Sequence, residues 1–200
     1  MISVCIPAKN KGVFYHDGRT AFPLSKCVRS IASSLSVLEL PHEIIIADAG
    51  NAGFCVENLP PTCRSVSMPE AEWTRGGARN FAAVEASGDI LAFIDADMLV
   101  GPTFFLRGLQ ETGAGNGYFP WYMRQRSFAS IETAQPPQEG IGHGCCVVRR
   151  EHWEANHWPE TAGWGGEDTA FAQWFDKQNL MIRDNWAGLI HLWHPAAEKK

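Results

Sequence analysis

The sequence predicts an α/β domain with a mostly parallel central sheet flanked by helices. Three observations support this fold class. Short apolar runs alternate with segments of helical periodicity along the chain. The run at residues 90–94 is apolar on both faces, as expected for a central parallel strand. The chain has 200 residues, of which 45% are hydrophobic and 20% are charged, so it is large and apolar enough to bury a core.

The first elements follow in order from these patterns. Residues 2–8 form an apolar run that predicts a strand, and the polar, glycine-containing stretch 9–22 predicts a loop. Residues 25–38 carry apolar side chains at helical spacing and predict a helix. The isoleucine-rich run 43–47 predicts a second strand that ends in a turn, and residues 64–68 predict a third.

The middle of the chain continues the alternation. Residues 74–87 predict a helix, for which Gly88 is the expected stop. The apolar strand at 90–94 follows and leads into Asp95-Ala96-Asp97. A proline near the start of residues 102–111 favours another helix there.

The C-terminal part is less regular. Residues 113–141 show weak periodicity and predict loops and short strands rather than a linker between domains. A strand is expected at 143–150, a glycine-rich loop at 163–166 and a helix at 168–178. Two further short strands are expected, at 181–183 and 188–193. We therefore expect a single domain.

Composition excludes several classes of protein. Disordered chains, collagen and coiled coils do not fit these proportions. The net charge is −5 and no cluster of Lys and Arg occurs, which disfavours nucleic-acid binding. No apolar run approaches the roughly 18 residues of a membrane span, and no signal-peptide pattern occurs. The six cysteines form no CxxC pair, so zinc-site spacing is absent. We expect a cytoplasmic protein without a transmembrane segment.

Two aspartates, Asp95 and Asp97, follow the strand at 90–94. Open α/β sheets place ligands beyond the carboxyl ends of their strands. Residues two apart in an extended segment project to the same side, so both carboxylates could face one divalent cation shared with substrate phosphates. The alternative is a pair of turn or capping aspartates, since Asp is favoured at turns. The spacing alone leaves both interpretations open.

Residues 163–168 combine three glycines, one tryptophan and two acids. The glycines let the backbone approach a ligand closely, and the indole of Trp164 offers a flat apolar face that suits a sugar ring. Glu167 and Asp168 follow at the start of the predicted helix, where acids also stabilise a helix by capping and by interaction with its dipole.

These motifs together, in this order, resemble the GT-A fold glycosyltransferases of the family 2 type. The loop at 163–168 further resembles the galactosyltransferase-type module of β-1,4-galactosyltransferases and chondroitin-polymerase-like enzymes. The resemblance covers nearly the whole chain. The matching strings are residues 4–10, 44–50, 75–80, 86–90, 93–97, 163–168 and 191–195.

The resemblance implies a GT-A fold and a metal-dependent, inverting transfer of a hexose or N-acetylhexosamine from a nucleotide-sugar. UDP is the favoured nucleotide, the acceptor is a hydroxyl of a glycan or another molecule, and polysaccharide biosynthesis is the expected context. Residues 1–100 would form the nucleotide-sugar half, and residues 101–200 the acceptor-binding and catalytic half. The residues implied to bind the nucleotide are Pro7, Ala8, Asp48, Arg75 and Asp95.

The same resemblance implies a metal site in which Asp95, Asp97 and His194 hold Mn²⁺ or Mg²⁺. His191 is the second choice for the histidine ligand. Such a cation stabilises the negative charge that develops on the departing diphosphate.

On the acceptor side, the resemblance places Trp164, Gly165 and Gly166 against the donor or acceptor sugar. Glu167 would bind acceptor hydroxyls, and Asp168 would be the general base. Two departures from the family pattern occur: Asp48-Ala49-Gly50 replaces a more acidic turn, and Thr169 replaces a third acid. Because of these departures, the resemblance does not identify the donor or the acceptor.

Two other functions remain at this point. A haloacid-dehalogenase-like phosphatase would use Asp95 as its nucleophile, but about ninety residues precede a motif that normally opens that fold. A non-catalytic module that binds nucleotide-sugars or glycans is the second, because fold does not fix function.

Overall fold

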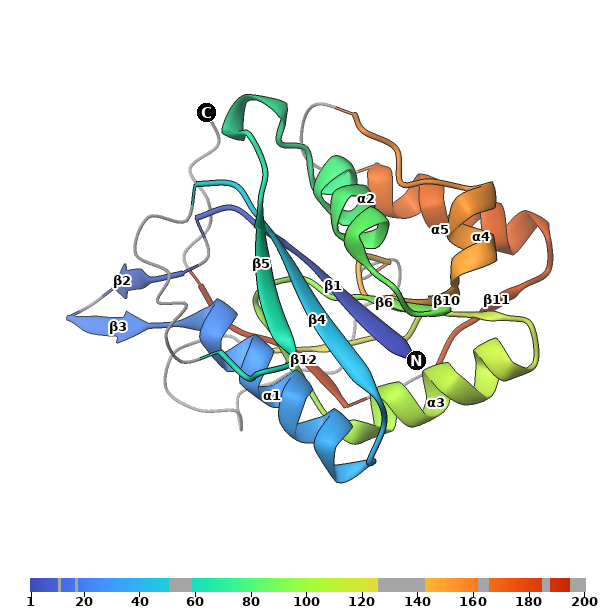
Figure 1. Ribbon diagram of the computed structural model, residues 1–200, viewed down its shortest axis with the longest axis horizontal. Coiled ribbons are helices and arrows are strands. Elements are labelled where there is room, and N and C mark those ends of the chain that lie inside the picture. Colours follow the sequence, from blue (N-terminus) through green and yellow to red (C-terminus); the bar gives the residue numbers. More distant parts are fainter. Residues whose placement is uncertain are drawn as a thin grey trace.

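A seven-stranded mixed sheet forms the centre of the computed structural model (Figure 1). The structure describes residues 1–10, 12–16, 18–50, 59–125, 143–161, 166–184 and 188–194. Neighbouring strands in the sheet are β11 (Met181–Ile182), β8 (Gly117–Tyr118), β10 (Cys146–Arg149), β6 (Ile90–Phe93), β1 (Ile2–Ala8), β4 (His42–Asp48) and β5 (Cys63–Ser67). Strand β10 runs antiparallel to β6 and β8, and the other pairings are parallel. The expected mostly parallel sheet is confirmed.

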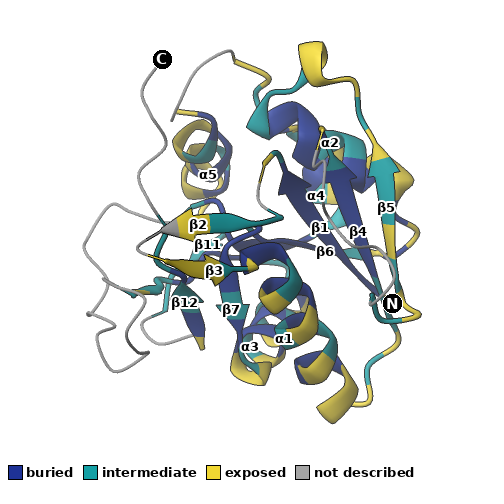
Figure 2. Ribbon diagram, turned by 90° about the vertical axis from the view of Figure 1, so that its left-hand side faces the viewer, coloured by how far each residue is buried: buried dark blue, intermediate teal, exposed yellow. Residues whose placement is uncertain are grey.

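Helices cover both faces of this sheet (Figures 1 and 2). Helices α1 (Pro23–Val37) and α3 (Pro102–Gly113) contribute to one apolar core. Helices α2 (Arg75–Glu85), α4 (Arg150–Ala155) and α5 (Glu167–Lys177) contribute to the other. All seven residues of β1 are buried, since helices flank it on both faces and strands on both edges. Period-2 alternation sends Val4 into the first core and Cys5 into the second.

Two smaller sheets extend from this framework. One pairs β7 (Met98–Val100) with β12 (Leu189–His191), which in turn pairs with β9 (Met123–Arg124). The other is a hairpin of β2 (Phe14–His16) and β3 (Arg19–Ala21). The prediction of a plain loop over residues 9–22 was therefore wrong. Gly18 adopts φ +70°, which the tight connection needs, and Phe14 makes a distant contact that the local sequence does not reveal.

Two local predictions also change. Helix α2 ends at Glu85, with Ala86 as its extended C-cap, so Gly88 does not stop it. A Cβ at Gly88 would lie 2.6 Å from the Met1 carbonyl oxygen, so glycine is needed there for close packing instead. Strand β10 is shorter than the predicted 143–150, because residues 143–145 form a turn and a bend and helix α4 begins at Arg150.

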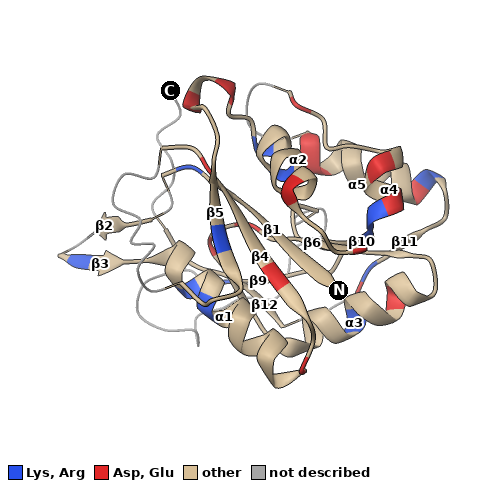
Figure 3. Cartoon of the chain, in the orientation of Figure 1, with Lys and Arg blue, Asp and Glu red and all other residues tan. Residues whose placement is uncertain are grey.

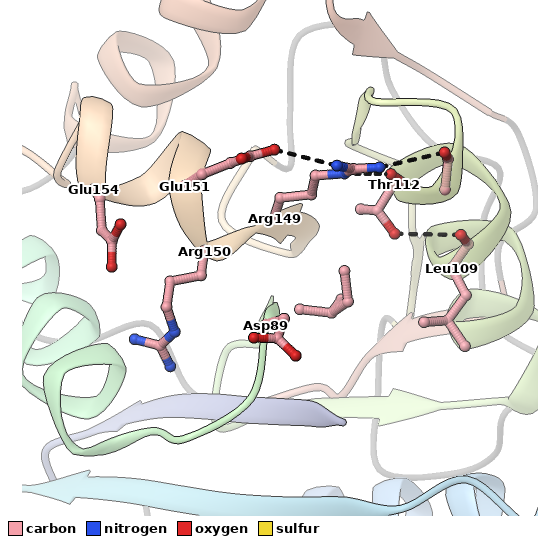
Figure 4. A pocket seen from close by; sticks show the side chains of 9 residues that line it. Asp89, Leu109, Thr112, Arg149, Arg150, Glu151 and Glu154 are labelled. Atoms are coloured by element: carbon pink, nitrogen blue, oxygen red, sulfur yellow. Dashed lines mark hydrogen bonds and ion pairs between the residues drawn. The ribbon is translucent and has the colours of Figure 1, made fainter.

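A hollow of about 440 Å³ lies at the edge of the sheet where β6 begins (Figure 4). Arg150 donates hydrogen bonds to carbonyl oxygens at the end of α2, including that of Ala86. Arg149 donates to the Thr112 carbonyl oxygen at the end of α3. Both arginines thus provide hydrogen-bond donors for carbonyl groups at the C-terminal ends of helices. No helix in the described ranges is long and apolar enough to cross a bilayer.

Helix α3 approaches β10 through Gly108. A Cβ at that position would lie 2.5 Å from Cγ2 of Val147, whereas a Cβ at Gly113 of the same helix would meet nothing within 4 Å. We expect Gly108→Ala to lower the free energy of unfolding by about 1–3 kcal/mol through overpacking. The matched control Gly113→Ala should leave stability unchanged or raise it by up to about 1 kcal/mol. Urea unfolding measures both, and equal stabilities of the two variants would contradict this packing.

Candidate active site

The carboxyl ends of β1, β4 and β6 meet at one edge of the sheet, because these strands are parallel. Ala8 pairs in register with Asp48, and Pro7 with Ala47. The Ala49 N–H also donates to the Ala8 carbonyl oxygen over 3.0 Å. The structure therefore brings together three of the residues assigned to the nucleotide, and their role stays a prediction.

A buried arginine organises the centre of this edge. Arg79 projects from α2 and its side chain is fully buried. Its Nη2 donates to Asp95 Oδ1, and its Nη1 donates to Asp168 Oδ1, both over 2.7 Å. Burial alone would lower the pKa of Arg79, but Asp95 and Asp168 raise it above its ordinary value. The guanidinium therefore stays charged and bridges the strand end to the start of α5.

A stack of two aromatic rings packs against this arginine. The Arg79 guanidinium carbon lies 4.3 Å from the centre of the Trp158 ring, which stacks on Phe171 at 3.9 Å. Asn80 accepts hydrogen bonds from the Trp158 backbone N–H and the Trp153 indole. Helix α2 thus holds both the arginine and its aromatic platform in one place.

The sequence interpretation assigned no role to Arg79, although a signal exists. Arg79 lies three residues before Ala82 and seven before Ala86, on the buried face of the helix. An arginine within an apolar helix face needs a carboxylate partner, because a buried charge is costly unless it is paired. That reasoning points to a buried ion pair without identifying its partners.

The two acids that open α5 face helix α2. Figure 3 shows acidic residues at the start of α5 beside basic residues of α2. Glu167 is buried, and its Oε1 lies 3.5 Å from Arg75 Nη1 and 3.9 Å from Arg79 Nη1. Glu167 therefore engages both arginines. Its contact with acceptor hydroxyls and the role of Asp168 as base stay predictions.

Gly144 lets the backbone approach these charged groups. A Cβ at Gly144 would lie 2.6 Å from Arg79 Nη2, 3.0 Å from Asp95 Oδ2 and 3.2 Å from Asp168 Oδ2. A side chain at this position would displace the ion-pair network. Burial raises the pKa of the neighbouring Cys145 and Cys146 thiols well above the ordinary value, so neither is suited to act as a nucleophile.

A second cluster joins Asp97, His191 and His194. Their potential ligand atoms all lie within 4.8 Å of one another. His194 Nε2 is 3.1 Å from Asp97 Oδ2, and His191 Nε2 is 3.6 Å from Asp97 Oδ1. Strand β12 pairs antiparallel with β7, and the Leu192 N–H donates to the Asp97 carbonyl oxygen, which sets this arrangement. Both the first and the second choice of histidine thus reach the cluster.

Asp95 does not belong to this three-residue group. The Met98 N–H donates to the Asp95 carbonyl oxygen, so the chain turns after β6 instead of continuing as an extended strand. The extended backbone assumed for residues 95–97 is therefore not present, and the joint ligation of one cation by Asp95 and Asp97 stays a prediction. Asp95 pairs with Arg79, while Asp97 lies beside the histidines. Direct metal ligation by Asp95 stays a prediction.

The donor set of the cluster fits a divalent cation: it combines one carboxylate with two imidazoles. Burial lowers the pKa of His191, and Asp97 opposes this shift. The neutral imidazole, which is the form that binds metals, is therefore favoured at neutral pH.

Each histidine of the cluster carries an aromatic neighbour. The Phe14 ring of β2 stacks on His194 with centroids 5.5 Å apart and an interplanar angle of 16°. Tyr122 stacks on His191 at 5.7 Å and 25°. These contacts restrict the rotation of both imidazoles, as hydrogen bonds from outer residues restrict the ligands of known metal sites.

Three residues were assigned to a sugar. Trp164 and Gly165 lie outside the described residues. Gly166 precedes α5 as its N-cap residue and adopts φ +98°, a conformation that favours glycine. The assignment of these residues to the donor or acceptor sugar stays a prediction.

A family model described as glycosyl transferase family 2 matches residues 3–158. Because this match spans well over half of the chain, the protein belongs to glycosyl transferase family 2. The expected family and enzyme class are thereby confirmed, and the dehalogenase-like phosphatase is no longer a candidate. The resemblance of residues 163–168 to a galactosyltransferase-type module lies beyond the matched residues and stays a prediction.

No curated protein sequence matches this chain. Among solved structures, TarS of S. aureus, residues 1–349, in complex with UDP matches with a TM-score of 0.66 and 13% identity. The alignment covers 97% of this chain and 61% of that one. The complex of the same fragment with UDP-GlcNAc matches with a TM-score of 0.66 and 13% identity, covering 98% and 59%. A further TarS structure matches with a TM-score of 0.67 and 13% identity, covering 97% and 37%. This chain thus spans about three fifths of the TarS fragment, and the likeness confirms the GT-A fold.

Removing the charge of Arg79 would leave two carboxylates without their shared partner. We expect Arg79→Met, which keeps much of the side-chain volume, to lower the free energy of unfolding by about 3 kcal/mol. The exposed pair of Arg64 and Glu85 provides a control, and Arg64→Met should cost no more than about 1 kcal/mol. Chemical unfolding measures both values. A cost for Arg79→Met as small as the control would show that the buried bridge contributes little.

If the cluster of Asp97, His191 and His194 holds a divalent cation, the stack of Phe14 on His194 should affect the affinity for that cation. We expect Phe14→Ala to weaken Mn²⁺ binding about 10-fold or more, since the imidazole loses its orienting neighbour. Tyr15 lies next in the same hairpin but is 78% exposed, so Tyr15→Ala serves as the control. Calorimetric titration with Mn²⁺ measures both, and equal affinities would argue against an orienting role.

Proposed function

We propose that the protein transfers a sugar from a nucleotide-diphosphate donor to an acceptor hydroxyl, with inversion and with the aid of Mn²⁺. The observation that carries this proposal is the shared guanidinium of Arg79. It links Asp168 at the start of α5 to Asp95 at the end of β6, next to the Asp97 cluster. A candidate base and a candidate site for the leaving diphosphate thus lie beside each other.

Asp97, His191 and His194 would hold the cation. Two imidazoles suit Mn²⁺ better than Mg²⁺, which prefers oxygen ligands and an octahedral shell. When bound, the cation supplies Lewis-acid stabilisation of the charge on the departing diphosphate. Asp95, oriented by Arg79, would contact the nucleotide and complete the site.

Asp168 would take the proton from the acceptor hydroxyl. Arg79 orients one oxygen of this carboxylate, and the other oxygen faces Gly144, where no side chain intervenes. The proton leaves late, when attack on the anomeric carbon has already acidified the hydroxyl. A single base opposite a single leaving group gives in-line displacement and inversion.

The donor is proposed to be a UDP-sugar carrying a hexose or an N-acetylhexosamine. TarS structures of the same fold hold UDP and UDP-GlcNAc, which supports this donor class. Pro7, Ala8, Asp48 and Arg75 would contact the nucleotide from the carboxyl ends of β1 and β4 and the start of α2. The sugar would lie against Trp164, Gly165 and Gly166, and Glu167 would contact acceptor hydroxyls.

We further propose that residues 1–200 act as one domain in polysaccharide biosynthesis in the cytoplasm. Five cysteines in the described ranges are free thiols, which is typical of a reducing compartment.

Calorimetric titration with UDP and GDP, with and without Mn²⁺, tests the donor site. We expect binding of UDP that depends on Mn²⁺. Asp97→Asn should weaken it at least about tenfold, because even outer-shell changes at metal sites cost that much. If the wild-type protein binds neither nucleotide under any of these conditions, the proposed function is wrong.

The role of Asp168 needs a separate measurement. We expect Asp168→Asn to keep UDP binding but to slow sugar release from UDP-sugars by about 10²–10⁴-fold, as loss of a general base does. Circular dichroism checks that the variant folds. Release at the wild-type rate would exclude Asp168 as the base, and a binding module without turnover would show no release by either protein.

A further inference from the structure

The sheet edge that carries Asp95 continues across two more strands. Strands β8 and β11 are parallel to each other, and β8 is antiparallel to β10, which is antiparallel to β6. Both strands therefore run in the direction of β6 and end at the same edge. Trp121 follows β8 and Arg183 follows β11, and the Trp121 N–H donates to the Asp184 carbonyl oxygen over 2.9 Å. With about 4.8 Å between strands, β11 lies roughly 14 Å from β6 along this edge.

Arg183 lies over the indole of Trp121, with its guanidinium carbon 4.4 Å from the ring centre. Both residues are half-buried. Among the described residues, Arg183 forms no ion pair and donates no hydrogen bond to a carboxylate or a carbonyl oxygen. The neighbouring acid, Asp184, is already engaged by Arg107 at 3.1 Å. Stacking occupies one flat face of the Arg183 guanidinium and leaves its in-plane N–H groups available.

Three other arginines near the sheet, unlike Arg183, use their N–H groups in ion pairs or hydrogen bonds. Arg79 pairs with two carboxylates, and Arg149 and Arg150 donate to carbonyl oxygens at helix ends. Burial lowers the pKa of Arg183, while the charge of Asp176 opposes the shift. A half-buried guanidinium without a hydrogen-bonded anion is costly for folding, because desolvation is not offset by pairing. A bound anion would offset that cost.

One residue connects Arg183 to the candidate base. His143 precedes Gly144, whose backbone lies against Asp95 and Asp168. Burial lowers the pKa of His143, Arg183 lowers it further, and Asp168 opposes both effects. His143 therefore lies within electrostatic reach of both Arg183 and Asp168.

We infer that Arg183, stacked on Trp121, forms an acceptor subsite for an anionic group, either a phosphate or a carboxylate. This inference rests on the proposed function, since it assumes that an acceptor hydroxyl reaches Asp168. The planar fork of the guanidinium matches two oxygens of either anion. Strands β11 and β6 lie roughly 14 Å apart along this edge, so the anionic group would lie on a part of the acceptor away from the reacting hydroxyl. The acceptor then carries a phosphate or a carboxylate group in addition to the hydroxyl that reacts.

The test uses the full chain saturated with UDP and Mn²⁺, so that the donor site is occupied. Glycerol 3-phosphate, glycerate and glycerol serve as probes with a common backbone, and binding is followed by NMR titration. We expect the wild-type protein to bind at least one anionic probe more tightly than glycerol. The stronger of the two anions identifies the acceptor as a phosphate or a carboxylate.

Arg183→Gln should weaken binding of the preferred anion about tenfold or more, as expected for loss of hydrogen bonds to a charged group. Arg29→Gln removes the same charge from an exposed position on α1 and should leave the affinity unchanged. If Arg183→Gln does not fold, Arg183→Lys replaces it, and loss of the planar fork should still weaken binding.

Equal binding of the three probes by the wild-type protein would overturn the inference, as would an unaltered anion affinity in the folded Arg183 variant. Binding of UDP with Mn²⁺ is measured in the same samples and does not depend on Arg183. Failure of the anion test with intact UDP binding therefore removes only this subsite, whereas absent UDP binding removes the proposed function.

Discussion

The charge of Arg79, placed inside the protein, is the constraint on which the rest of the site depends. A fully buried guanidinium must find carboxylates, and here it finds one from β6 and one from α5. These two elements lie far apart in the chain, and the arginine that joins them belongs to α2, which precedes both. The ion pairs therefore fix the position of α5 relative to the sheet. The candidate base is oriented by the same contacts that hold the fold together.

The second cluster depends on a different interaction, the pairing of β7 with β12. This pairing brings His191 and His194, near the end of the chain, to Asp97 in its middle. The β2–β3 hairpin and Tyr122 then contribute the aromatic rings that stack on the histidines. Backbone pairing sets the approximate geometry, and side-chain packing restricts it further. The two clusters thus arise from independent forces and meet at one sheet edge.

The tryptophans show how local composition and tertiary position differ. Trp158 is fully buried between Arg79 and Phe171, so it belongs to the core and also supports the site. Trp121 stacks with Arg183 at the far end of the same edge. Nothing in the flanking residues separates these roles, because each depends on an arginine from another element. The abundance of tryptophan in the sequence indicates only that large aromatic surfaces are available.

The sequence by itself determined the alternation of strands and helices, and with it the fold class, because hydrophobic periodicity is a local property. The ends of predicted strands also pointed to Asp95 and Asp97, whereas His191 and His194 were indicated only by the resemblance to a known family. Tertiary structure alone decided that Asp95 pairs with Arg79 while Asp97 joins the histidines. It also decided that residues 14–21 form a hairpin against His194. Those outcomes depend on contacts between segments that are distant in the sequence. Whether a buried charge finds an oppositely charged partner is decided only when these segments come together in the folded chain.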